Sequence, residues 1–212
     1  RVALDLGTAE DPRPLEERLA ALRAGQPDEG LLALYFNFGR YLLMASALGA
    51  ELPPNLQGKW NEELRPPWDC DLHLDVNLQM NYWPAEACNL PETLLPFVAW
   101  LERCLPSARE MARKLYGCEG VYYCLQTDIW GQVTPEARGW DVWTGAAAWL
   151  AQHLWWRWEY SHDRDFLREH AYPFLKEVAR FYETYLVRDD ERGWLVAVPS
   201  QSPENTFVGG TA

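Results

Sequence analysis

Hydrophobic residues recur every three to four positions in the segment from 28 to 47, which is the spacing of one face of an α-helix. The positions that carry this pattern are Leu31, Leu34, Phe38 and Leu42. Asp28 stands just before them, where its carboxylate can accept a hydrogen bond from a free N–H of the first turn. The pattern therefore predicts a helix over 28–47 with an aspartate cap and one apolar face.

The same period recurs in three later segments, which are also expected to be helices. They span Leu94 to Lys114, Ala147 to Trp158 (through Leu150 and Leu154), and Phe166 to Tyr185 (through His170, Phe174, Val178 and Phe181). Proline lacks the N–H that a helix interior needs, so Pro106 and Pro173 are expected to kink or divide two of these helices. Outside Trp194 to Val198 there is little strand signal.

Long connections rich in Gly and Pro separate the helical segments, at 51–69, 116–144 and 188–199. Connections of this length are more often functional than idle, so a binding face is expected there. Helices joined by alternating loops indicate an all-α fold of stacked antiparallel pairs, either a solenoid or a closed α/α toroid. No repeat of fixed period favours the solenoid. A toroid of twelve helices needs on the order of 250 residues or more, and this chain would supply about half of it.

Charge and hydropathy exclude some partners. The 212 residues carry a net charge of −12 and no Lys/Arg-rich run, which disfavours nucleic acid and anionic membrane surfaces. The longest apolar stretches fall far short of the roughly 20 residues that a membrane span requires. The chain starts at Arg1 with no signal pattern, so we expect the true N-terminus to lie upstream, and localisation cannot be read.

Cysteine and tryptophan usage adds two expectations. The five cysteines form no metal-binding spacing and cannot all pair internally, so mostly buried free thiols are expected. The 12 tryptophans form either a Trp-rich core or stacking platforms for sugar rings. Those at helical positions, Trp149, Trp155, Trp156 and Trp158, are expected to be core or barrel packing.

Polar and apolar residues alternate without exception from Asp71 to Asn81. If this segment is extended, His73, Asp75 and Asn77 share one face. If it is helical, His73 and Asn77 are neighbours while Asp75 meets Gln79. Such a group can hold a water molecule, although a half-exposed edge strand would show the same pattern. His-x-Asp also begins the facial iron triad, but that site is built on strands and this chain is mostly helical.

Several motifs together resemble glycoside hydrolase family 95. They are Asn55-Leu56-Gln57-Gly58-Lys59-Trp60-Asn61, the row from His73 to Asn77, Asn77 to Glu86 (Asn-Leu-Gln-Met-Asn-Tyr-Trp-Pro-Ala-Glu), Trp140 to Gly145, the helix with Trp149, Gln152 and His153, and Pro199 to Asn205. The resemblance implies an (α/α)6 barrel without a metal cofactor that removes α-linked L-fucose, mostly 1,2-linked, with inversion. It makes residues 1–27 a connector with a short helix near Leu15 to Leu22, and 28–212 the N-terminal half of the barrel, truncated at its C-terminus. The implied partners are a fucosylated oligosaccharide and the remainder of the same chain.

The resemblance also assigns roles to residues of this sequence. Glu204 matches the general acid, although without the resemblance Ser202-Pro203-Glu204 would rather indicate a plain helix start. Asn77 matches the second of two water-holding asparagines, whereas Asp75 occupies the position of the first. Asp75 is therefore either a general base or a substitute for the amide oxygen. His73 is implied to line the sugar pocket, and Trp140 to form one of its walls.

Two other functions remain open from the sequence. An α-L-galactosidase would use the same chemistry, because L-galactose differs from L-fucose only by a hydroxyl at C6. A non-catalytic sugar-binding or scaffold remnant is the alternative from a different class, since half a toroid lacks its closing helices. We expect the isolated fragment to be inactive in either case.

Overall fold

The computed structural model describes residues 2–8, 10–135 and 142–203, and within them helices dominate. Glu204 and Trp140 lie outside the described residues. The helices of the first half of the chain are α1 (Leu15–Arg23), α2 (Glu29–Ala47), the short 3-10 turn η1 (Pro67–Cys70), α3 (Asn77–Tyr82), α4 (Pro84–Ala87) and η2 (Pro91–Leu94). Those of the second half are α5 (Leu95–Met111), the π-helical turn η3 (Ala112–Tyr116), α6 (Ala146–Ser161), α7 (Arg164–Phe166), the π-helical turn η4 (Leu167–Ala171) and α8 (Tyr172–Tyr185).

The described strands are only two residues long each. β1 (Leu72–His73) pairs antiparallel with β2 (Gln126–Thr127), with Leu72 opposite Thr127. β3 (Val187–Arg188) pairs antiparallel with β4 (Leu195–Val196), which lies within the stretch where strand signal was expected. The prediction of a mostly helical, all-α chain is therefore confirmed.

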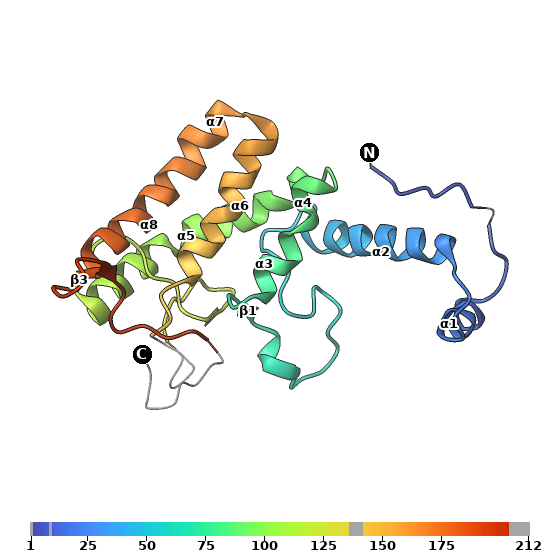
Figure 1. Cartoon of the computed structure of the whole chain (residues 1–212), viewed down its shortest axis with the longest axis horizontal. Helices are drawn as coiled ribbons and strands as arrows, with labels where there is room; N and C mark the ends of the chain where they lie inside the picture. Colours follow the sequence, from blue (N-terminus) through green and yellow to red (C-terminus); the bar gives the residue numbers. More distant parts are fainter. Residues whose placement is uncertain (1, 9, 136–141, 204–212) are drawn as a thin grey trace.

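The core lies where α5, α6 and α8 meet. α6 packs against α3, α4 and α8, and the antiparallel course of α6 and α8 is visible in Figure 1. Trp100 and Leu101 of α5, Leu150 of α6, and Phe174 and Phe181 of α8 are almost completely buried. Amphipathic spacing predicted these segments because each has one apolar stripe that must be covered.

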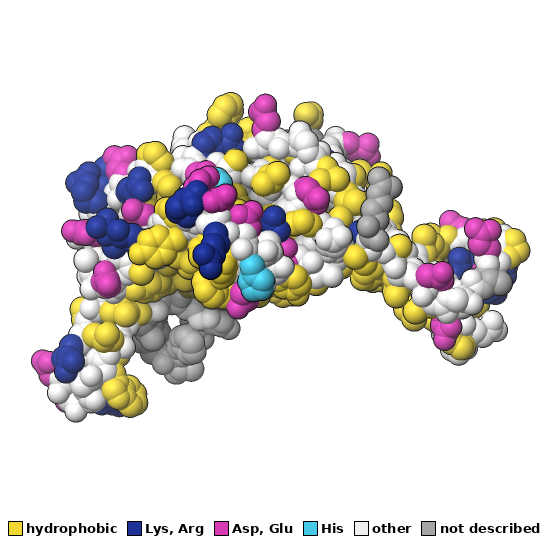
Figure 2. Space-filling model, turned by 90° about the horizontal axis from the view of Figure 1, so that it is seen from above, with side chains coloured by type: hydrophobic (Ala, Val, Ile, Leu, Met, Phe, Trp, Pro, Cys, Tyr) yellow, Lys and Arg dark blue, Asp and Glu magenta, His cyan; other side chains and the backbone are white. Residues whose placement is uncertain are grey.

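Helix α2 extends away from this body, with α1 beyond its free end (Figure 1). The Asp28 side chain caps α2 as predicted, accepting a hydrogen bond of 2.8 Å from the backbone N–H of Leu31. The expected buried face is wrong in part: Leu34 and Phe38 are 48% and 51% exposed, whereas Arg40, Leu43 and Ala47 are buried. Because α2 is apolar on more than one side, periodicity could not select the side that meets the body. Figure 2 shows hydrophobic side chains along the narrow part that joins α1 to the rest.

The two helix-interior prolines behave differently. α5 runs through Pro106 without a break, so of the two expected effects, a kink or a division, this proline does not cause the division. Pro173 stands in the first turn of α8, directly after the π-helical turn η4, where its missing N–H costs least. The predicted helix from Phe166 to Tyr185 therefore changes from a π-helical turn to an α-helix next to Pro173.

Two further expectations concern the burial of the cysteine and tryptophan side chains. All five cysteines are free, and four of them are buried. Among the described tryptophans only Trp100 is fully buried, and Trp155 is exposed although it sits on α6. No described helix is long and apolar enough to cross a membrane.

Candidate active site

Three residues that the sequence placed together line one cavity of about 300 Å³. The residues around this cavity are Leu56, Trp68, His73, Asp75, Val76 and Asn77. It combines an imidazole, a carboxylate and an amide with apolar walls, which is the usual composition of a small-molecule site. No group of three or more His, Cys, Asp or Glu in the described ranges could hold a metal ion.

The segment that carries these residues is a strand followed by a helix, which is neither of the two forms considered from the sequence. β1 holds His73 opposite Gln126, and the Leu74 N–H donates to the Leu125 carbonyl at 2.7 Å. The chain then turns at Asp75 and Val76 and enters α3 at Asn77. The three residues therefore line one cavity because the turn brings the start of a helix beside the end of a strand.

The alternation from 71 to 81 fails after the turn. Gln79 is fully buried and donates from Nε2 to the Leu74 carbonyl at 2.6 Å, while Met80 is 48% exposed. From Asn77 onward the segment is helical, so side chains return to the same face every 3.6 residues instead of every two. Gln79 therefore faces the core and not the polar side that the strand pattern predicted. The buried Gln79 amide ties the first turn of α3 to the strand end and so fixes the position of Asn77 relative to His73.

The His73 ring is hydrogen-bonded to the side chain of Asp71. Its Nδ1 lies 3.2 Å from each oxygen of the Asp71 carboxylate, and only 8% of His73 is exposed. A carboxylate only accepts hydrogen bonds, so the Nδ1–H of His73 donates to Asp71. The sequence did not indicate this role for Asp71, although the residue belongs to the same polar row.

The loop before the strand forms the opposite wall. The Leu56 N–H donates to the Asp71 carbonyl at 3.1 Å, and the Gln57 side chain donates from Nε2 to the Pro67 carbonyl at 3.2 Å. Gly58 has a φ of +67°, and a Cβ there would lie 2.7 Å from the Trp60 ring. The Gly in the motif from Asn55 to Asn61 is thus required by a tight turn under Trp60.

Trp68 is a member of the cavity wall that sequence reasoning missed. Trp68, Asp69 and Cys70 all have left-handed backbone conformations, with φ of 49°, 52° and 56°. This conformation costs roughly 1–2 kcal/mol per non-glycine residue. The only signal in the sequence was a tryptophan directly after two prolines, in a long loop.

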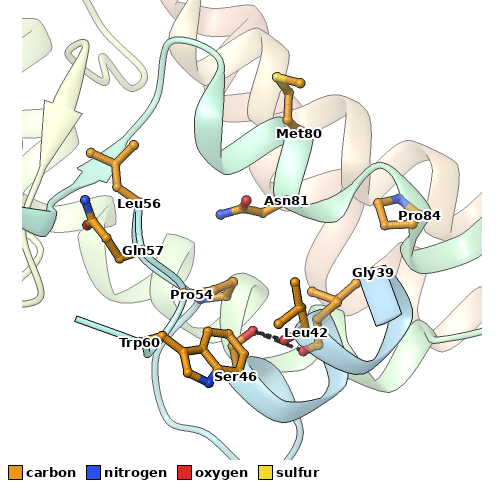
Figure 3. Close-up of a pocket in the computed structure, with 12 residues that line it drawn as sticks. Gly39, Leu42, Ser46, Pro54, Leu56, Gln57, Trp60, Met80, Asn81 and Pro84 are labelled. Atoms are coloured by element: carbon orange, nitrogen blue, oxygen red, sulfur yellow. Dashed lines mark hydrogen bonds between the residues drawn. The ribbon is translucent and has the colours of Figure 1, made fainter. Parts of the chain in front are cut away.

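A second cavity, of about 410 Å³, lies between α2, the segment 54–60 and the helices α3 and α4. Leu56 lines both cavities. Figure 3 shows the amide of Asn81 pointing into the second cavity from α3, with Trp60 on the opposite side. The Ser46 hydroxyl donates to the Leu42 carbonyl at 2.7 Å and so stays within α2.

The segment that leads to Glu204 is described as far as Pro203. The Tyr185 hydroxyl at the end of α8 donates a hydrogen bond to the Pro199 carbonyl, and Gln201 is buried. These contacts anchor the chain just before the expected general acid. The roles expected for Glu204 and Trp140 stay predictions, because both lie outside the described residues.

Known proteins are similar to this chain over most of its length. Residues 1–211 match the model of the glycosyl hydrolase family 95 catalytic domain. Alpha-L-fucosidase 2 of Arabidopsis thaliana is 35% identical over 204 residues, which is 95% of this chain and 24% of that protein. Probable alpha-fucosidase A of Aspergillus niger is 36% identical over 199 residues, which is 91% of this chain and 25% of that protein.

This chain spans about a quarter of the length of these curated relatives. The family match nevertheless covers nearly all of its 212 residues. It includes the loop from Asn55 to Asn61 and the polar row, which contribute residues to the cavity, and the segment from Pro199. The chain therefore belongs to glycoside hydrolase family 95.

Proposed function

We propose that the protein carrying this chain releases terminal α-linked L-fucose, mostly α-1,2-linked, from oligosaccharides with inversion at the anomeric carbon. The observation that carries this proposal is the convergence of His73, Asp75 and Asn77 on one cavity. Membership of a glycoside hydrolase family supports the reaction type, and the α-fucosidase names of the relatives support the sugar.

The proposed mechanism divides the work between two sides of the sugar ring. An inverting hydrolase protonates the leaving oxygen with one group and activates a water on the opposite face with another, roughly 6.5–9.5 Å away. Glu204 is the proposed acid. Asp75 and Asn77 are proposed to position the water, since a carboxylate and an amide oxygen can both accept its hydrogen bonds.

The proposed architecture is half of an (α/α)6 barrel over 28–212, preceded by a connector at 1–27. The exposed apolar side of α2, with Leu32, Tyr35 and Phe38, is consistent with a helix that is covered by the rest of the protein. The relatives are about four times as long as the matched region, which leaves room for such a cover. We expect the isolated 212 residues to be poorly soluble and to release little or no fucose.

The test of this function uses the full-length protein and a fucosylated oligosaccharide. Proton NMR of the first product should show β-L-fucose, because inversion of an α-linkage yields that anomer. Glu204→Gln should lower kcat by about 10²–10⁴-fold while sugar affinity stays nearly unchanged. The matched control is Glu63→Gln on an exposed loop position, which should keep full activity.

Two results would overturn parts of this proposal. Equal turnover by Glu204→Gln would remove Glu204 as the acid, and initial release of α-L-fucose would exclude inversion. A hydrophobic pocket rejects an added hydroxyl by only about a hundredfold, so the enzyme could act on both L-fucosides and L-galactosides. The two substrates are therefore distinguished by comparing kcat/KM on an α-L-galactoside with kcat/KM on the matching α-L-fucoside. A larger kcat/KM on the galactoside would assign the enzyme to that substrate.

A further inference from the structure

Trp68 presents an unusually open aromatic ring at the candidate active site. It is 70% exposed, yet it lines the same cavity as His73, Asp75 and Asn77. Large aromatic side chains normally bury most of their surface, so an indole left open beside polar groups is available to a ligand.

The turn that carries Trp68 is fixed at both ends. Within the turn, the Asp69 N–H donates to the Pro66 carbonyl and the Asp71 N–H donates to the Trp68 carbonyl, each at 3.2 Å. From outside, Gln57 donates to the Pro67 carbonyl and Leu56 donates to the Asp71 carbonyl. The indole is therefore mounted on an anchored turn that joins directly to the strand of His73.

The backbone of this turn adopts a conformation that L-residues rarely take. Three consecutive residues, Trp68, Asp69 and Cys70, have positive φ. Unfavourable backbone geometry that the surrounding contacts enforce is concentrated at ligand-binding sites in proteins. The left-handed turn accounts for the exposure of the Trp68 side chain. Leu72 and Leu74, which follow the turn, are buried in the core.

The chemistry around the cavity matches one face of a sugar ring and its hydroxyls. An indole packs against the C–H face of a pyranose, while an imidazole, a carboxylate and an amide exchange hydrogen bonds with hydroxyl groups. We propose that Trp68 is the stacking platform for the terminal pyranose, with Gln57 as the residue that positions its turn. This proposal rests on the proposed function only for the identity of the sugar, L-fucose.

The test compares variants of the full-length protein in two measurements. One is the dissociation constant for free L-fucose by ligand-detected NMR, and the other is kcat and KM on a fucosylated oligosaccharide. Trp68→Ala should raise the dissociation constant about tenfold, in line with the energy of one aromatic stacking contact. Trp68→Phe should raise it less, because a smaller ring remains.

The matched control is Trp194→Ala. Trp194 is 63% exposed and lies beside β4 on the β3–β4 hairpin, so its removal also deletes an open indole. This variant should bind L-fucose as the wild type does. Gln57→Leu, which removes the donor to the Pro67 carbonyl, should raise KM with a smaller change in kcat, and Gln57→Asn should not restore it because its side chain is shorter.

The outcomes separate this inference from the proposed function. If the wild type releases fucose and Trp68→Ala binds L-fucose within twofold of it, the stacking proposal is wrong and the enzymatic one stands. If the wild type releases no fucose but binds another pyranose in a Trp68-dependent way, the stacking proposal stands alone. If Trp68→Ala fails to fold, Trp68→Phe decides, and unchanged affinity in that variant overturns the proposal.

Discussion

Both carboxylate oxygens of Asp71 lie 3.2 Å from Nδ1 of His73, and Asp71 directly precedes the strand that carries this histidine. The pair places a charged acceptor behind a ring that faces the candidate active site. Because Asp71 also accepts a backbone hydrogen bond from Leu56, one residue links the imidazole to the loop that forms the opposite wall.

Removing that carboxylate should weaken the enzyme without unfolding it. Asp71→Ala leaves His73 Nδ1 without its charged partner, and hydrogen bonds to charged groups contribute about 1.5–3 kcal/mol. We expect kcat/KM on a fucoside to fall by roughly ten- to a hundredfold. Asp71→Asn should lose less, since its amide oxygen still accepts from Nδ1, and equal losses in both variants would show that charge rather than ring orientation is what matters.

The role of Asp75 can be decided by a single substitution. If Asp75 is the general base, Asp75→Asn should lower kcat by about 10²–10⁴-fold. If Asp75 only reproduces the hydrogen bond of an amide oxygen, Asp75→Asn should keep or raise activity. Steady-state kinetics of the full-length protein give the answer, with Asn77→Asp as the companion that tests whether the second position tolerates a carboxylate.

Gly120 should be intolerant of any side chain. Its φ is +72°, and a Cβ would lie 2.2 Å from the Glu177 carbonyl oxygen and 2.5 Å from the Phe181 nitrogen in α8. Backbone cannot move aside as a flexible side chain can, so Gly120→Ala should lower the free energy of unfolding by at least about 3 kcal/mol. Gly117→Ala is the control: it has a φ of +65° with open space around it and should cost only about 1–2 kcal/mol. Denaturant titration measures both, and equal costs would contradict the close approach.

Stability at mildly acidic pH should depend on His153. Burial among Tyr82, Phe97 and Trp156 lowers the pKa of this histidine from 6.5 to about 4. Between these two pH values His153 binds a proton in the unfolded chain but not in the folded chain. The free energy of unfolding is therefore unaffected by His153 above pH 6.5 and falls by roughly 3 kcal/mol as the pH drops to about 4.

The measurement is the free energy of unfolding across this pH range for three proteins. His153→Leu should remove most of the slope that the wild type shows. His162→Asn replaces an exposed histidine by a residue that tolerates the same left-handed backbone, and it should leave the slope intact. A slope that persists in His153→Leu would assign the acid sensitivity to other groups.

Sequence reasoning succeeded where one side of a segment had to be buried. α6 and α8 are helices, and Leu150, Leu154, Phe174, Val178 and Phe181 are buried as their spacing predicted. It failed where tertiary contacts selected the conformation. The row from 71 to 81 switches from strand to helix because β2 and Gln79 hold its two halves differently, and no period of its own residues encodes that.

The candidate site was predictable in its polar members and not in its aromatic wall. His73, Asp75 and Asn77 are close in sequence, so almost any compact backbone brings them together. Trp68 reaches the same cavity only because its turn adopts left-handed geometry and is tied to Leu56 and Gln57. Such long-range backbone contacts leave little trace in composition or spacing.

Leu56 has a consequence for redesign, because it lines both cavities. One of these cavities has a volume of about 300 Å³ and the other of about 410 Å³. We expect that trimming this one side chain to alanine enlarges the space beside position 56 while leaving the backbone hydrogen bond from position 56 to Asp71 in place. The fold thus offers a single-residue route toward a larger candidate active site.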